Sequence, residues 1–251
     1  MAEVFEIKKC RIQTKDKNVK VAYFDTDVES KVNCYLYLLP GQGSNEEWDS
    51  KGGIVDLMKS ILQNKRHPSM RIIMPYIYAN NGEDCISKIK DAQNVTSYIE
   101  DIVNYFEGID SWQSINGYKR RAVAGVCLGA LSALKLGLYW EQPCREKKEK
   151  FYSVALLSPA NDAGAANWIC GADAFKFANN QHHSVYISCG SKDEKKVHAN
   201  RYGYNFIKND LTITITLKSF IGGGHDWACF KKEFEDFMSE NIYSDEYYQN
   251  I

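Results

Sequence analysis

Cys127 stands between two glycines in the pentapeptide GVCLG at positions 125–129. A short apolar run suited to a buried strand precedes this segment, and apolar residues continue after it at helical density. A reactive side chain on such a strand-to-helix turn is typical of a nucleophile elbow, which lifts the nucleophile clear of the backbone. The flanking glycines let strand and helix approach closely, and the helix N-terminus favours negative charge on the sulfur. The pattern predicts a nucleophile at Cys127, and its structural alternative is a small buried cysteine in a turn.

A thiol nucleophile needs a base within hydrogen-bond reach and a further group that orients the base. His225 is the favoured base because it follows three glycines after a predicted strand, in the segment IGGGHDW. Such a loop can carry an imidazole over the end of a neighbouring strand. His182 and His183 precede a strand, and His198 lies inside a predicted helix, so we interpret these three as surface or structural residues.

The orienting acid is expected at the end of a strand between the nucleophile and His225. Asp193 follows the apolar strand 185–189 and is the best candidate, with Glu194 as the alternative. Asp210 precedes its strand and Asp226 adjoins the histidine, so neither is well placed. The structural alternative for Asp193 is a solvated turn or a helix cap.

Charge that develops on a carbonyl oxygen needs hydrogen-bond donors that are already in place. The backbone N–H of Leu128, directly after the nucleophile, is one expected donor. The loop after the apolar strand 32–39 is expected to supply the other, and we favour the N–H of Gln42 within Gly41-Gln42-Gly43, although an ordinary glycine turn would look the same. A cysteine beside an imidazole and a helix N-terminus is also expected to have a lowered pKa.

The elements around these residues alternate between strands and helices from residue 32 onward. This alternation predicts an α/β fold with a mainly parallel sheet covered on both faces. Loose alternation over 4–12 and 19–24 adds an antiparallel N-terminal hairpin, and the absence of a linker or repeat favours one domain over residues 1–251. The expected strands are 32–39, 70–74, 122–124, 151–157, 185–189 and 211–217, and the expected helices are 52–63, 95–106, 130–138, 195–207 and 227–238.

The overall composition excludes several classes of function. A formal net charge of −1 gives no electrostatic case for nucleic acid or an anionic membrane, and no apolar run approaches a membrane span of ~20 residues. The eight cysteines include no C-x-x-C pair and read as mostly reduced core thiols, so we expect a cytoplasmic protein. A secreted one would require an export sequence removed from upstream. We expect neither a metal nor an organic cofactor, and a homo-oligomer is compatible with the sequence.

Six segments together carry a resemblance to a known family over nearly the whole chain. They are LYLLPGQGSNEEW, RIIMPY, RAVAGVCLGALSALKLGL, FYSVALLSPA, YISCGSKDE and GGGHDWACF. They resemble the putative-esterase family of α/β-hydrolases, which includes feruloyl and acetyl-xylan esterases, tributyrin-type esterases and S-formylglutathione hydrolase. The GVCLG turn also resembles the elbow of dienelactone hydrolase, but the HDW segment and the PGQGS loop favour the esterase group.

The resemblance implies an α/β-hydrolase fold and places Cys127 as nucleophile, Asp193 as acid and His225 as base. It implies oxyanion donors at Leu128 and Gln42 and an ester substrate that is small or linked to carbohydrate. We further expect substrate-binding roles for Gly41, Trp48, Tyr76 and Trp227, although large aromatic residues are commonly part of a core. The sequence departs from the family pattern at three positions, with Cys127 for serine, Pro40 for histidine and Ala130 for glycine.

We therefore predict a carboxyl-ester hydrolase that works through a covalent acyl-enzyme, with a small-molecule or carbohydrate ester as its partner. Because the nucleophile position holds cysteine, three alternatives stay open. The chain is then an impaired or engineered serine-to-cysteine esterase, an acyltransferase, or a non-catalytic acyl- or carbohydrate-binding protein on the same scaffold.

Overall fold

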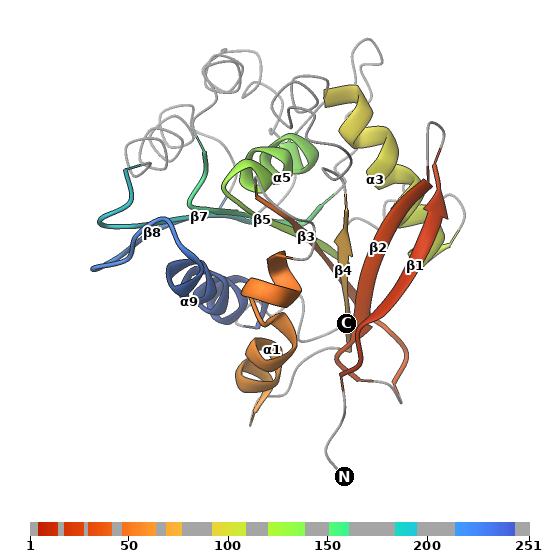
Figure 1. The fold of residues 1–251 in the computed structure, drawn as a ribbon, viewed down its shortest axis with the longest axis horizontal. Coiled ribbons are helices and arrows are strands. Elements are labelled where there is room, and N and C mark those ends of the chain that lie inside the picture. The colour runs from red at the N-terminus through yellow and green to blue at the C-terminus, as the bar shows by residue number, and fades with distance from the viewer. Residues whose placement is uncertain are drawn as a thin grey trace.

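The computed structural model describes residues 5–14, 18–27, 30–41, 47–63, 69–76, 92–108, 120–138, 151–160, 184–194 and 214–243. Within these ranges the strands form one eight-stranded sheet in the order β1-β2-β4-β3-β5-β6-β7-β8 (Figure 1). The strands are β1 (Lys8–Gln13), β2 (Asn18–Asp25), β3 (Cys34–Leu39), β4 (Met70–Pro75), β5 (Arg121–Val126), β6 (Ser153–Leu157), β7 (Ser184–Gly190) and β8 (Thr214–Phe220).

The sheet is parallel from β4 through β8 and antiparallel at its N-terminal edge. β1 pairs with β2 as a hairpin, and β2 continues antiparallel onto β4, whereas β3 pairs in parallel with both β4 and β5. The expected mainly parallel sheet with an antiparallel hairpin is therefore confirmed. Since β5 lies inside the sheet, between β3 and β6, the turn that follows it has a strand end on either side.

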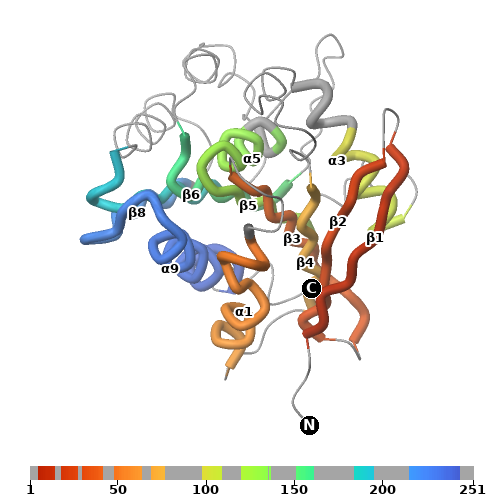
Figure 2. The backbone as a smooth tube through the Cα atoms, in the orientation of Figure 1, coloured from red at the N-terminus to blue at the C-terminus, as the bar shows by residue number. Residues whose placement is uncertain are grey.

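Two pairs of helices cover the two faces of the sheet (Figures 1 and 2). One face packs against α3 (Ala92–Glu107) and α5 (Leu128–Leu138), and the other against α1 (Ile54–Leu62) and α9 (Trp227–Phe237). The central strands are buried on both sides, which is why their sequences are continuously apolar and not alternating. In β3, for example, Leu36 faces the α1 and α9 side, and Tyr37 faces the α3 and α5 side.

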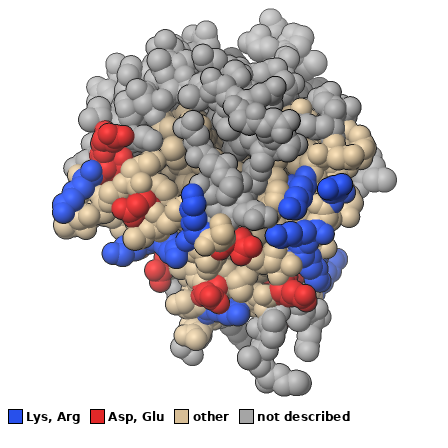
Figure 3. Space-filling view, viewed as in Figure 1, with Lys and Arg blue, Asp and Glu red and all other residues tan. Residues whose placement is uncertain are grey.

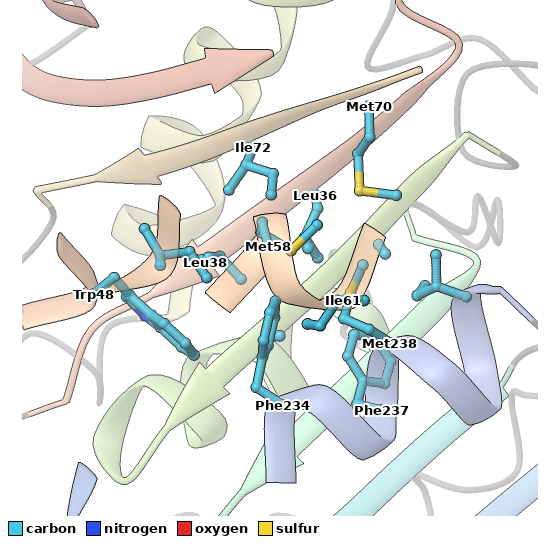
Figure 4. Close-up of a cluster of buried hydrophobic side chains, with 14 of the residues drawn as sticks. Leu36, Leu38, Trp48, Met58, Ile61, Met70, Ile72, Phe234, Phe237 and Met238 are labelled. Carbon is cyan, nitrogen blue, oxygen red and sulfur yellow. The ribbon is translucent and has the colours of Figure 1, made fainter. Parts of the chain in front are cut away.

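The core on the α1 and α9 side is rich in aromatic and methionine side chains (Figure 4). Phe234 and Phe237 project from α9 onto the sheet, and Met58 meets them from α1. The apolar spacing of α9 thus fixes one face of the helix against β6 and β7, which end near the predicted site. The same face carries the fully buried Glu233.

Several elements differ in extent from the sequence-based expectations. The last strand begins at Thr214 in the described part of the chain and runs to Phe220, three residues beyond the alternating segment that predicted it. The π-helical segments η1 (Glu47–Lys51) and η3 (Met238–Ile242) were not expected. The predicted helix 195–207 lies outside the described residues. None of the helices in the described ranges is long and apolar enough to cross a membrane.

A buried ion pair marks the amino ends of the parallel strands. Arg121, at the start of β5, is fully buried, and its Nε lies 2.8 Å and 2.9 Å from the two carboxylate oxygens of Glu107. The hydroxyl of Tyr37 donates a further hydrogen bond of 2.8 Å to the same carboxylate. These contacts satisfy a charge pair that would otherwise be costly to bury, and they lie at the opposite end of β5 from Cys127.

Candidate active site

Cys127 occupies a sharp turn between β5 and α5. Its φ angle is +54°, in the left-handed region that side chains other than glycine rarely adopt. The turn is held from the neighbouring strand, because the N–H of Cys127 donates to the carbonyl of Leu157 at 3.0 Å and the N–H of Ala160 donates to the carbonyl of Cys127 at 3.1 Å. This is the strained strand-to-helix geometry that a nucleophile elbow requires.

The two glycines of the elbow allow backbone segments to touch. A Cβ atom on Gly125 would lie 2.1 Å from the carbonyl oxygen of Gly129, and one on Gly129 would lie 2.4 Å from the carbonyl oxygen of Leu39. Both distances are far shorter than any real Cβ contact. The glycines are therefore required by close packing between β5, α5 and the end of β3, as the sequence predicted.

The acid turn after β7 and the histidine loop after β8 are hydrogen-bonded to each other. The N–H groups of Ser191 and Lys192 donate to the carbonyls of Phe220 and Gly223, at 2.8 Å and 2.9 Å. A Cβ on Gly190 would meet the Gly223 carbonyl at 2.3 Å, so these two backbones also pass in direct contact. Contacts between the two backbones therefore set the distance between the acid turn and the histidine loop.

The side chains of Asp193, His225 and Cys127 form a continuous hydrogen-bonded chain. Nδ1 of His225 lies 2.7 Å from Oδ2 of Asp193, and the imidazole also hydrogen-bonds to the Cys127 thiol. A carboxylate only accepts, so Nδ1 donates to Asp193, which leaves Nε2 for the sulfur. Residues 127, 193 and 225, far apart in the chain, are thus brought together at the carboxyl ends of β5, β7 and β8.

The environment of the His225 imidazole raises its pKa above the ordinary value. Partial burial, the largest influence, lowers the pKa, but the hydrogen bonds and charges of Cys127 and Asp193 together outweigh burial. The side chain of Asp193 is fully buried, whereas that of His225 is 24% exposed. A partly exposed imidazole whose other nitrogen contacts a buried carboxylate can take a proton from a thiol and then release it.

The alternative acids take other roles in the structure. Glu194 is exposed, whereas Asp193 is the residue that faces His225. Asp226 caps the N-terminus of α9, where its Oδ1 accepts a hydrogen bond of 3.0 Å from the backbone N–H of Cys229. His182, His183 and His198 lie outside the described residues.

The structure describes one of the two expected oxyanion donors, Leu128, whereas the other, Gln42, belongs to a segment outside the described residues. Leu128 is the first residue of α5, so its backbone N–H is one of those at a helix N-terminus that lack an acceptor within the helix. Gln42 lies outside the described residues, but Gly41, directly before it, is buried at the end of β3. Gly129 of α5 packs so closely against the backbone after β3 that a Cβ on it would meet the carbonyl oxygens of Leu39 and Pro40.

The expected substrate contact by Trp48 is corrected by its burial. Trp48 lies in the buried apolar cluster on the α1 and α9 side (Figure 4). Only 1% of the residue is exposed, and its Nε1–H donates to the carbonyl of Leu39 at 3.1 Å. Its ring packs edge-on against Trp227, with centroids 5.2 Å apart. A ring inside the core cannot cover a substrate, so Trp48 instead fixes the backbone from which the Gln42 loop departs.

The other aromatic candidates lie closer to the surface. Trp227 is half-buried at the start of α9, two residues after His225, and also packs against Phe230. Tyr76 follows β4, two strands away from β5, with the ammonium of Lys20 5.0 Å from its ring centroid. The structure thus keeps Trp227 beside the histidine and places Tyr76 farther along the same edge of the sheet.

Sequence reasoning missed one buried group behind the site. Glu233 on α9 is fully buried, and its Oε1 accepts hydrogen bonds from Ser158 Oγ at 2.9 Å and from Cys229 Sγ at 3.3 Å. Ser158, at the end of β6, also has a left-handed backbone, with φ +43°. The available signal was the carboxylate at position 233 directly before Phe234, on the apolar face of a closing helix.

Comparison with known proteins identifies the family to which the chain belongs. The arrangement of sheet, helices and strand-end turns is that of the α/β-hydrolases. Residues 16–239 match the family described as "Putative esterase", and the chain belongs to this family and is an esterase-type hydrolase. A comparison with curated protein sequences gives no significant match.

Solved structures with the same fold include several esterases at low sequence identity. A ferulic acid esterase from the anaerobic fungus Anaeromyces mucronatus is 20% identical, with TM-score 0.72 over 97% of this chain and 92% of that one. The feruloyl esterase module from Clostridium thermocellum, solved with sinapinate, is 15% identical, with TM-score 0.70 over 94% and 87%. S-formylglutathione hydrolase from Staphylococcus aureus is 14% identical, with TM-score 0.61 over 94% and 98%.

Proposed function

We propose that the protein is a carboxyl-ester hydrolase in which Cys127 is the nucleophile, His225 the general base and acid, and Asp193 the group that orients the imidazole. The observation that carries this proposal is the hydrogen-bonded chain from the buried Asp193 through His225 to a thiol on a left-handed turn. Carboxyl-ester hydrolysis is also the chemistry that membership of the esterase family supports.

In the proposed reaction, Sγ of Cys127 attacks the ester carbonyl carbon while Nε2 of His225 takes the thiol proton. The backbone N–H groups of Leu128 and Gln42 stabilise the negative oxygen of the tetrahedral intermediate. The C–O bond of the ester then breaks, and the leaving alcohol takes the proton from His225. Water next attacks the thioester as His225 takes its proton, and the acid leaves as that proton returns to sulfur.

The proposed substrate is a small or carbohydrate-linked carboxyl ester. The esterases of similar fold include proteins described as feruloyl esterases, one of them solved with sinapinate, which makes an aromatic acyl group the first choice. The half-buried Trp227 beside His225 is a suitable surface for such a ring. Gly41 and Tyr76 are the further proposed substrate contacts.

The proposal is tested by comparing ester hydrolysis by the wild-type protein and the Cys127→Ala variant. We expect an initial burst with p-nitrophenyl acetate, a covalent acyl adduct at Cys127 in the mass spectrum, and a rate lowered by roughly 10²- to 10⁴-fold in the variant. Cys10→Ala is the matched control, because Cys10 is a half-exposed cysteine on β1, remote from the elbow. Unchanged turnover in Cys127→Ala would contradict the proposal.

Two further measurements separate the alternatives raised by cysteine at this position. A large gain in esterase rate in Cys127→Ser would identify a site built for serine, whereas a loss would identify sulfur as the working nucleophile. Binding of an ester without any adduct at Cys127 would identify a binding protein. A panel of methyl ferulate, S-formylglutathione and p-nitrophenyl acetate, with and without an alcohol acceptor, distinguishes the acyl preference and separates hydrolysis from acyl transfer.

A further inference from the structure

The proposed triad rests against a second buried carboxyl group that the reaction does not use. Glu233 is fully buried between α9 and the ends of β6 and β7, and among the described residues it has no basic partner. Its Oε1 accepts from the hydroxyl of Ser158 and the thiol of Cys229, and its Oε2 has no hydrogen-bond partner in the part of the chain that the structure describes. A buried carboxylate with this few donors is poorly stabilised, so the neutral acid is favoured.

Hydrogen-bonded neighbours of Glu233 connect it with the turn that holds Cys127 and with the side chain of Asp193. Ser158 belongs to the segment that holds the elbow, since the neighbouring residues Leu157 and Ala160 bond to the two backbone groups of Cys127. On the acid side, the Ser158 hydroxyl lies 3.8 Å from the thiol of Cys189, and that thiol in turn hydrogen-bonds to the side chain of Asp193. Polar groups therefore run without a break from Glu233 to Asp193.

Within the described ranges, the side chains that interact with Glu233 are neutral or acidic. They are Ser158 after β6, Tyr186, Ser188 and Cys189 on β7, Asp193 in the acid turn and Cys229 on α9. Burial, together with the charge of Asp193, raises the pKa of Glu233 to about 7, although the Ser158, Cys229 and Ser188 side chains lower it in part. The carboxyl group consequently changes charge within the neutral range, behind a carboxylate that contacts His225.

We infer that Glu233 is a positioning residue of the proposed triad, which ties the end of β6 to α9 and sets, by its own charge, the electrostatic field behind Asp193. This inference rests on the proposed function of Cys127. When Glu233 ionises, the added negative charge lies behind Asp193, whose carboxylate contacts His225, and so favours a proton on the imidazole. Ionisation of Glu233 therefore increases the fraction of thiolate–imidazolium pair at Cys127.

The test measures the rate of iodoacetamide alkylation at Cys127 from about pH 5 to about pH 9 in three proteins. Glu233→Gln keeps the shape and the acceptor oxygen but cannot ionise, and Glu235→Gln is the matched control on the exposed side of the same helix. The labelled Cys127 peptide is quantified by mass spectrometry. We expect a second rise in the wild-type profile near pH 7, so that at about pH 8 wild type and Glu235→Gln react roughly two- to five-fold faster than Glu233→Gln.

Identical pH profiles of the alkylation rate in the wild type and Glu233→Gln would overturn the inference. A wild-type profile that shows one rise, without the second rise near pH 7, would also overturn it. The infrared carbonyl band of a protonated carboxyl gives a second readout, expected in the wild type below pH 7 and absent from Glu233→Gln. A wild type without a band that titrates near neutrality would also overturn the inference. A Cys127 that reacts only as an ordinary thiol would instead overturn the proposed function, and the infrared band would still decide the charge of Glu233.

Discussion

At the scale of single residues, the proposed chemistry depends on how His225 balances burial against its partners. Burial alone would lower the pKa of the imidazole and leave it a weak base. Asp193 and Cys127 reverse that tendency and stabilise the protonated imidazole, which is the form that the proposed proton transfer from sulfur would produce. The buried side chain of Asp193 makes this effect strong, because little solvent screens it.

Replacement of Asp193 by asparagine tests this balance. The variant removes one of the influences that raise the pKa of His225, so the acidic limb of the kcat/KM profile should move to lower pH. The rate at the optimum should fall by roughly 10²- to 10⁴-fold, because the amide no longer holds the required tautomer. The pH dependence of ester hydrolysis checks both effects. An acidic limb that stays in place in Asp193→Asn would contradict the assigned role, and Glu194→Gln is the matched control.

The residues that could be predicted from the sequence are those whose place follows from topology. Cys127, Asp193 and His225 each follow a strand of a parallel sheet, and parallel strands end at the same edge. Trp48 and Glu233 could not be placed, because neither an aromatic residue after a loop nor a carboxylate in a helix reveals its burial. Burial depends on which segments cover a residue, and these segments come from distant parts of the chain.

At the scale of elements, the elbow is fixed by contacts between backbones that leave no room for a side chain. The carbonyl of Gly129 occupies the position that a Cβ on Gly125 would need, and β5 is buried on both faces. A methyl group there cannot be accommodated by moving a flexible side chain, so α5 itself must shift. Such a shift would move Leu128 and the thiol of Cys127 together.

We therefore expect Gly125→Ala to lower the free energy of unfolding by about 3 kcal/mol or more and to reduce ester hydrolysis strongly. Gly222→Ala is the matched comparison, since its Cβ would meet nothing within 4 Å and only its positive φ of 78° is strained. That variant should cost about 1 kcal/mol. Urea unfolding of both variants is the measurement, and equal losses would show that backbone contact at the elbow is not limiting.

Elements were predictable where apolar periodicity and sheet position agree. The apolar runs 32–39, 122–124 and 151–157 predict buried strands, and the structure has a strand within or around each of them. The strand β8 runs three residues past its expected end, because alternation in LTITITL marks a favourable sequence but not where pairing with β7 ends. The π-helical turns depend on packing against other elements and leave no periodic signal.

At the scale of the whole molecule, Glu233 links the stability of the fold to pH. Its pKa is about 7 in the folded protein and is raised from an ordinary value of 4.5. The folded state thus binds the proton more tightly than the unfolded chain does. The resulting stabilisation is complete below about pH 4.5 and is lost as the pH rises through about 7, by an amount on the order of 3 kcal/mol.

The Glu233→Gln variant should not show this loss. Relative to wild type, its free energy of unfolding should increase by on the order of 3 kcal/mol between about pH 5 and about pH 8. Urea unfolding at the two pH values, with Glu235→Gln as the control that keeps the wild-type dependence, is the measurement. A constant difference between Glu233→Gln and wild type across this range would contradict the assignment of a neutral carboxyl.

Charged side chains of both signs occur across the described surface shown in Figure 3, so this face carries no strong field of one sign. A net charge of −1 for the whole sequence agrees with that view. Capture of a neutral ester would therefore depend on apolar contact and shape more than on long-range attraction. Its rate should change little with salt, which stopped-flow measurements of acylation at two ionic strengths can check.

The parallel strands give the molecule two unlike poles. Cys127, Asp193 and His225 lie at one pole, whereas the buried pair of Arg121 and Glu107 closes the other. Lys31 is exposed just before β3, on the Arg121 side, since Tyr35 pairs with Arg121 in the sheet. A protein tethered to a solid support through position 31 would consequently turn the strand ends that carry Cys127, Asp193 and His225 toward the bulk liquid, away from the support.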